Sequence, residues 1–163
     1  MVTVLLLAGG KSSRMGADKA TMRGGVSRLK DVAFRCGVER VITLCGGEER
    51  RHLFDGEIWP DPPFCNSLPE VIEWAITNIE GDIQLICCDA FDLQQDGFQF
   101  LLSSGGGVPL DERGIRQPLL ANCPNGWKKS QSDGSVSSIF QHLPSLDAAL
   151  MASQMKNYNS PDD

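Results

Sequence analysis

Three short apolar runs stand out in the first half of the chain. They are VTVLLLA at residues 2–8, RVITLCG at 40–46 and DIQLICCDA at 82–90. Short continuous runs rich in strand-forming residues are typical of strands that are covered on both faces, as in a parallel sheet. The pattern therefore predicts three buried, parallel strands.

Helical spacing appears between these runs. Apolar residues three and four positions apart predict a helix over residues 26–36. A second helix is marked at its start by Ser67 and Glu70, which form an S-x-x-E capping box, and by Pro69 in the first turn. Its apolar face recurs at helical spacing, and Gly81 is a plausible stop.

Strands that alternate with helices imply right-handed crossovers and a doubly wound α/β sheet. We expect a single domain over residues 1–163, with a Rossmann-like, three-layer architecture and a mostly parallel sheet, because no repeat or long linker divides the chain. The remaining pattern predicts a helix at 94–103, strands in GVPL and RQPLLANC (the second interrupted by Pro118), and short helices near 136–142 and 145–155.

Composition narrows the class of protein. The 163 residues are 41% hydrophobic and 22% charged, and the net charge of -6 argues against a general nucleic-acid binder. No apolar run approaches the roughly 20 residues that span a bilayer, and no basic residue precedes the first run, so we expect a cytoplasmic protein without a membrane segment. The six cysteines form no C-x-x-C pair, and buried free thiols are expected.

The first apolar run leads into the loop LAGGKSSRMGADKA. Gly9 and Gly10 can adopt positive φ and bring backbone N–H groups close to a ligand. Lys11, Arg14 and Lys19 are the residue types that bind phosphate. The loop is neither a Walker A sequence nor a G-x-G-x-x-G fingerprint, and taken alone it also fits a surface turn with solvated cations.

Asp89 ends the third apolar run, where a carboxylate needs a partner. A salt bridge or a helix cap would supply one. A Mg²⁺ ion would supply another, because it prefers oxygen ligands and is commonly bound together with substrate phosphates. Since ligands of open α/β sheets lie beyond the carboxyl ends of the strands, a cationic loop and a carboxylate at neighbouring strand ends favour the magnesium interpretation.

The loop at residues 7–20 resembles the L-A-G-G-x-S-x-R-M-G-x-D-K signature of the glycosyltransferase-A-like nucleotidyltransferases, and more narrowly the molybdenum cofactor guanylyltransferase family. Four further segments occur in that family's order: WPDPP with Asp61, ICCDAFDL with Asp89, RQPLLANCP, and the closing NYNSPDD. The resemblance spans nearly the whole chain, but identity is strong only in the first motif.

This resemblance implies a glycosyltransferase-A-like fold and a Mg²⁺-dependent reaction. The reaction transfers GMP from GTP to the phosphate of molybdenum cofactor and releases pyrophosphate. Its implied partners are GTP, a phosphorylated pterin and other proteins of the cofactor pathway. The resemblance implies base and ribose contacts by Leu7, Ala8 and Gly9, with Gly10 also at the nucleotide. Asp61 would contact the nucleotide, and Asp89 would hold the metal that binds it. The implied catalytic residues are Asp89 together with Arg14 and Lys19, which would hold the triphosphate and stabilise the leaving pyrophosphate.

The sequence departs from the family pattern in three places. CNSLPEVI stands where the family has GPLAGI, with Asn66 and Glu70 in place of glycines. LCGGEE lacks the asparagine that often follows the second strand in the family. Asp89 is followed by Ala90, where the family has an aspartate-methionine-proline or similar turn. Three hypotheses remain: a divergent guanylyltransferase, a cytidylyltransferase or other nucleotidyltransferase with a different acceptor, and a non-catalytic member that binds nucleotide or a pathway partner.

Overall fold

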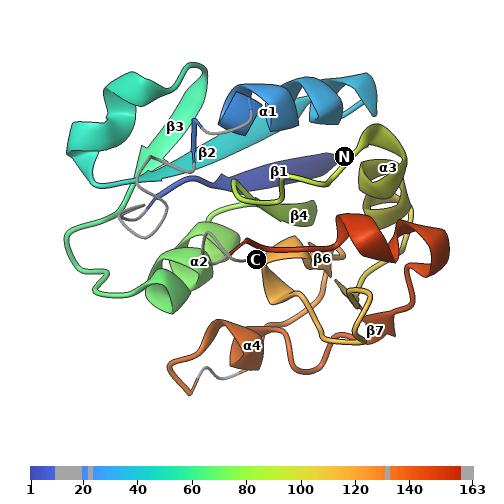
Figure 1. Cartoon of the computed structure of the whole chain (residues 1–163). Helices are drawn as coiled ribbons and strands as arrows, with labels where there is room; N and C mark the ends of the chain where they lie inside the picture. Colours follow the sequence, from blue (N-terminus) through green and yellow to red (C-terminus); the bar gives the residue numbers. More distant parts are fainter. Residues whose placement is uncertain (10–19, 22–23, 131–132, 159–163) are drawn as a thin grey trace.

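A five-stranded sheet forms the centre of the computed structural model, which describes residues 1–9, 20–21, 24–130 and 133–158. Its strand order is β3-β2-β1-β4-β6, and only β6 runs antiparallel to its neighbour (Figure 1). The strands are β1 (Val2–Leu7), β2 (Arg40–Gly46), β3 (Glu57–Pro60), β4 (Asp82–Cys87) and β6 (Asn122–Cys123). The expected α/β fold with a mostly parallel sheet is confirmed.

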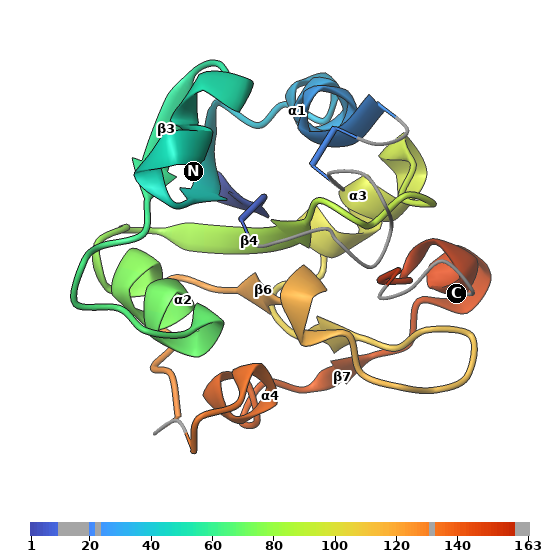
Figure 2. The same ribbon diagram turned by 60° about the vertical axis from the view of Figure 1, so that its left-hand side comes forward.

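Helices cover both faces of this sheet. On one face lie α1 (Gly25–Arg35) and α3 (Gln95–Leu102), and on the other lie α2 (Leu68–Thr77) and α4 (Val136–Ile139) (Figure 2). Side chains of β1 alternate between the two cores: Leu6 packs with α1 and α3, whereas Leu5 packs with α2 and α4. Burial on both sides explains why every residue of β1 except Thr3 is apolar. Among the described residues, no helix combines the length and apolar composition that crossing a bilayer requires.

The last third of the chain differs from the sequence-based expectation. RQPLLANC is not one strand: Pro118 opens the 3-10 helix η4 (Pro118–Leu120), and only Asn122 and Cys123 pair with β4. Proline lacks a backbone N–H and fixes φ, so the segment turns before it pairs. The segment expected to be helical at 145–155 instead begins as β7 (Ser145–Leu146), which pairs with β5 (Val108–Pro109), and continues as the 3-10 helix η5 (Ala149–Gln154).

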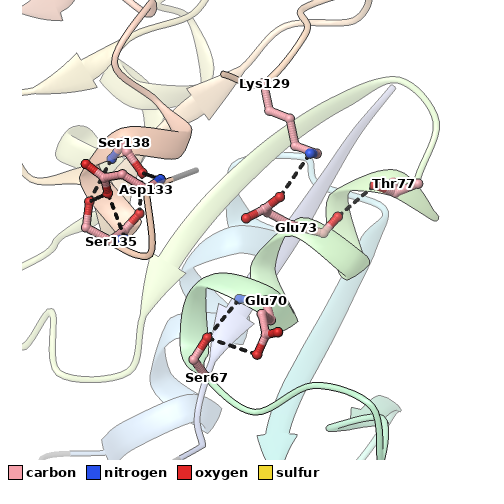
Figure 3. A network of polar contacts seen from close by, with 8 residues as sticks. All are labelled: Ser67, Glu70, Glu73, Thr77, Lys129, Asp133, Ser135 and Ser138. Carbon is pink, nitrogen blue, oxygen red and sulfur yellow. Dashed lines mark hydrogen bonds and ion pairs between the residues drawn. The ribbon is translucent and has the colours of Figure 1, made fainter. Parts of the chain in front are cut away.

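Two elements lie between β2 and α2. They are the 3-10 helix η3 (Glu48–Leu53) and the edge strand β3, which the hydrophobic pattern did not indicate. The start of α2 follows the predicted capping box: Ser67 Oγ accepts a hydrogen bond from the Glu70 amide at 3.4 Å (Figure 3). The Glu70 carboxylate in turn accepts from the Asn66 amide at 2.7 Å. Helix α2 ends at Thr77, four residues before the expected stop at Gly81.

Candidate functional site

The carboxyl ends of β1 and β4 form the centre of the candidate site. After β1 the chain crosses to β2, and β4 lies on the other side of β1, so the strand order reverses direction here. Open α/β sheets bind ligands at such a switch point. Leu7 lies opposite Leu44 of β2 and Cys87 of β4, and the Cys88 amide donates to the Leu7 carbonyl at 3.0 Å. The residues after Leu7 and after Cys87 therefore leave the sheet side by side.

Leu7 and Ala8 offer a ligand little side-chain surface. The Leu7 side chain packs in the core against α2, and Ala8 is 1% exposed. The Ala8 amide donates to the Leu44 carbonyl at 2.9 Å, which extends the pairing of β1 beyond its last residue. Contacts from these two residues to a nucleotide would therefore come from the backbone.

Gly9 is a glycine for a reason that differs from the sequence-based argument. Positive φ is found at Gly46 (85°), at the end of β2, but not at Gly9. A Cβ atom on Gly9 would lie 2.8 Å from the Gly46 Cα and 2.9 Å from its nitrogen, so the two backbones touch. Close approach of β1 and β2, rather than an unusual backbone angle, requires glycine at position 9.

Arg50 is a site residue that sequence reasoning missed. From η3, its Nε donates to the Cys45 carbonyl at 2.8 Å and its Nη2 donates to the Ala8 carbonyl at 2.7 Å. The half-buried guanidinium thus joins the ends of β1 and β2. The sequence offers no signal for this contact, because the Ala8 carbonyl is 42 residues away and every residue has a carbonyl.

Asp89 lies where the strand pattern predicts, directly beyond β4, and is only 8% exposed. Its carbonyl accepts a hydrogen bond from the Tyr158 amide at 3.4 Å. Burial, followed by the charge of Asp89, raises the pKa of the Cys87 thiol well above its ordinary value, so this thiol stays protonated. The described residues contain no group of three or more acidic, histidine or cysteine side chains that could hold a metal. One carboxylate ligand from the protein is compatible with Mg²⁺, which typically keeps several waters and binds phosphate oxygens as well.

Asp61 lies beyond the end of β3, and its amide donates to the Gly46 carbonyl at 2.7 Å. It borders a groove of about 610 Å³ whose walls include Trp59 and Trp74. Although Asp61 is exposed overall, partial burial of its carboxyl and then the negative charge of Glu49 raise its pKa. The groove runs along the β3 edge, and its lining does not include Asp89.

Three of the predicted site residues, Gly10, Arg14 and Lys19, lie outside the described residues. Glu70, the charged replacement for a family glycine, turns back on its own helix start, where Oε2 also accepts a hydrogen bond from Ser67 Oγ at 3.2 Å (Figure 3). Its charge is therefore used in capping α2.

Comparison with solved structures supports this fold. A protein of Aquifex aeolicus VF5 superimposes with a TM-score of 0.72 at 15% identity, over 97% of this chain and 93% of that one. Molybdopterin-guanine dinucleotide biosynthesis protein A of Archaeoglobus fulgidus gives 0.66 at 14% identity, over 98% and 93%. Rv0371c of Mycobacterium tuberculosis H37Rv, solved in complex with manganese, gives 0.53 at 16% identity, over 76% and 70%.

Sequence comparison gives the family. No curated protein sequence matches the chain significantly. Residues 4–149, however, match a domain family, and this span includes both strand ends that form the candidate site. The match also covers the loop that resembles the nucleotidyltransferase signature. The chain belongs to the MobA-like NTP transferase domain family.

Proposed function

We propose that this family member is a divalent-metal-dependent nucleotidyltransferase that transfers GMP from GTP to the phosphate of molybdenum cofactor. One observation carries the proposal: the buried carboxylate of Asp89 follows β4 at the switch point, beside the segment Leu7–Gly9 that leads into the signature loop. The Archaeoglobus protein with a similar fold is named for molybdopterin-guanine dinucleotide biosynthesis, which supports guanine as the base and a pterin as the acceptor. The proposal places the reaction in the cytoplasm, in contact with other proteins of the cofactor pathway.

The proposed reaction needs no nucleophilic side chain. A phosphate oxygen of the acceptor attacks the α-phosphorus of GTP and forms the new P–O bond. The bond from the α-phosphorus to the oxygen that bridges it to the β-phosphate breaks, and pyrophosphate leaves with the electron pair. Asp89 would hold Mg²⁺, which neutralises charge on the phosphates. Arg14 and Lys19 are assigned to the triphosphate, and catalysis rests on positioning and charge.

The second candidate function is a nucleotidyltransferase that uses a nucleotide other than GTP. The residues at the end of β2 are the reason to test it. Gly46 and Gly47 stand where the family often has an asparagine, so these positions supply no side chain that reads a base. CTP in place of GTP would give a cytidylyltransferase with the same chemistry. A non-catalytic member that binds nucleotide or a pathway protein is the third candidate.

Thermal unfolding with Mg²⁺ and GTP, CTP, ATP or UTP separates these candidates. A ligand that binds only the native state stabilises it by about 2.7 kcal/mol at one hundred times its dissociation constant. We expect a magnesium-dependent rise of Tm with GTP, and pyrophosphate release once the molybdenum-loaded pterin is added. The Lys19→Ala variant should keep its fold and lose most of the transfer. A rise with CTP alone would support the second candidate. Binding of nucleotide without pyrophosphate release would support the third.

A further inference from the structure

Arg28 makes an unusual set of contacts with the loop that carries Asp89. It lies in the first half of α1, and its guanidinium is half-buried. Nη1 donates to the Leu93 carbonyl at 2.7 Å, and Nη2 donates to the carbonyls of Ala90 at 3.0 Å and Phe91 at 3.3 Å. One side chain therefore binds three of the four carbonyls that follow Asp89.

Only arginine suits this arrangement. Its N–H donors are fixed in a rigid, planar fork, whereas lysine presents three donors on a single nitrogen. Ala90 and Leu93 are fully buried and Phe91 is 8% exposed, so the loop lies against the core instead of in solvent. Burial of the guanidinium lowers its pKa, and the nearby charge of Asp92 partly offsets this effect. Burying a charge is costly, and an apolar side chain could have filled the space at lower cost.

The C-terminal segment holds the same loop at other points. Tyr158 donates through its hydroxyl to the Asp92 carboxylate at 2.5 Å and through its amide to the Asp89 carbonyl. Its ring packs on Phe91 with 5.2 Å between the ring centroids. The backbone around Asp89 is thus held by Arg28 of α1 and by Tyr158, in addition to its hydrogen bond with β1 through Cys88.

Helix α1 begins at Gly25, and four residues separate it from the end of the signature segment at 7–20. We propose that Arg28 is a positioning residue that holds the loop after β4 in a fixed place relative to α1, and thereby keeps Asp89 in position to bind the metal. This inference rests on the proposed function. It concerns a residue that lies outside the signature motif and whose hydrogen bonds go to backbone carbonyls of the loop.

The test compares Arg28→Met and Arg28→Lys with a matched control, Arg40→Met. Arg40 also donates two hydrogen bonds, both to the Glu57 carboxylate at 2.9 Å, but this exposed pair lies at the amino ends of β2 and β3, away from the carboxyl edge that carries Asp89. Affinity for Mn²⁺ in the presence of GTP is measured by electron paramagnetic resonance, and amide hydrogen exchange is measured over residues 88–94. Steady-state transfer supplies kcat and KM.

We expect Arg28→Met to weaken Mn²⁺ binding by about tenfold, the lower end of the loss seen when groups that orient metal ligands are removed, because Arg28 holds the backbone next to Asp89 and not its carboxylate. Hydrogen exchange over 88–94 should speed up, and kcat should fall by a larger factor than KM rises. Arg28→Lys should lie between Arg28→Met and wild type, because the three donors of an ammonium are on one nitrogen, whereas the guanidinium reaches the carbonyls from two. Arg40→Met should keep wild-type Mn²⁺ affinity within about twofold, since exposed pairs contribute little.

The outcomes separate this inference from the proposed function. If the wild-type protein binds no nucleotide in the presence of metal, the proposed function and the inference both fail. If it binds and a folded Arg28→Met variant has unchanged Mn²⁺ affinity, only the inference is overturned. Should Arg28→Met not fold, Arg28→Lys decides: wild-type Mn²⁺ affinity together with wild-type hydrogen exchange over 88–94 in this variant overturns the inference.

Discussion

The loops that follow β3 and β4 reach the same edge of the sheet, but they are held in different ways. The loop after β3 leads into α2 through a local network, in which Glu70 bonds Asn66 and Ser67. The loop after β4 is held by Arg28 and Tyr158, which lie more than 60 residues away in the sequence.

Burial follows the same division. Phe64 in the β3 loop is 68% exposed, whereas Phe91 in the β4 loop is 8% exposed. A loop with buried apolar side chains and long-range hydrogen bonds opens at a high free-energy cost, and a locally capped, exposed loop opens more easily. The comparison indicates that the β4 loop is a preorganised support for Asp89, while the β3 loop tolerates changes such as the loss of the family glycines.

The largest effect should come from Asp89→Asn, which removes the charge but keeps the shape of the side chain. If Asp89 holds the metal, the transfer rate should fall by about 100-fold or more, because charge neutralisation by a bound ion contributes several kcal/mol to such reactions. Nucleotide binding should also lose its magnesium dependence. Isothermal titration with and without Mg²⁺ checks this, and magnesium-dependent binding equal to wild type would remove the metal role of Asp89.

A much smaller effect is expected from Ser67→Ala in the β3 loop. Loss of this N-cap should lower the free energy of unfolding by about 1 kcal/mol. Transfer activity should change little, because the capping network lies within the start of α2. Urea denaturation measures the stability. Ser135→Ala is the matched control, since Ser135 caps α4 through a bond from the Ser138 amide at 3.3 Å (Figure 3). A large loss of activity in Ser67→Ala alone would contradict the division between the loops.

The difference between local and long-range contacts also explains which features of the fold and the site could be predicted from the sequence. The strands β1, β2 and β4 and the cap at Ser67 follow from local patterns, and β–α alternation then places Asp89 at the carboxyl edge. The contacts of Arg28 and Arg50 have no local signal, because their acceptors are backbone carbonyls brought near only by the fold. Strand β3 was not predicted because its four residues include Glu57 and Pro60, and its extended form depends on pairing with β2.

A smaller effect is expected from an ion pair on the surface of α2. Lys129 Nζ lies 3.0 Å from Glu73 Oε2 and joins α2 to the segment after β6 (Figure 3). Both side chains are partly exposed, so their coupling should be about 0–1 kcal/mol and should weaken with added salt. A double-mutant cycle of Lys129→Met and Glu73→Gln, followed by urea denaturation at two salt concentrations, measures it. A coupling well above 1 kcal/mol would mean that a long-range polar contact adds measurably to the local capping network of α2.

The smallest effect concerns the pH dependence contributed by Asp61. Partial burial and then the charge of Glu49 raise its pKa in the folded protein. In the pH range between its unfolded pKa and the raised folded pKa, the folded state binds more protons, so this group's contribution to stability falls as the pH rises. Because Asp61 is exposed overall, solvent screens much of this effect.

The Asp61→Asn variant tests this contribution. It should remove that part of the slope, so that the stability difference between variant and wild type shifts toward the variant as the pH increases through this range. Urea denaturation of both proteins across the acidic range measures the difference. A difference that moves in the opposite direction would show that Asp61 is stabilised in its charged form. The carboxylate would then have a cationic partner in the folded protein, and the β3 loop would be held by more than its local contacts.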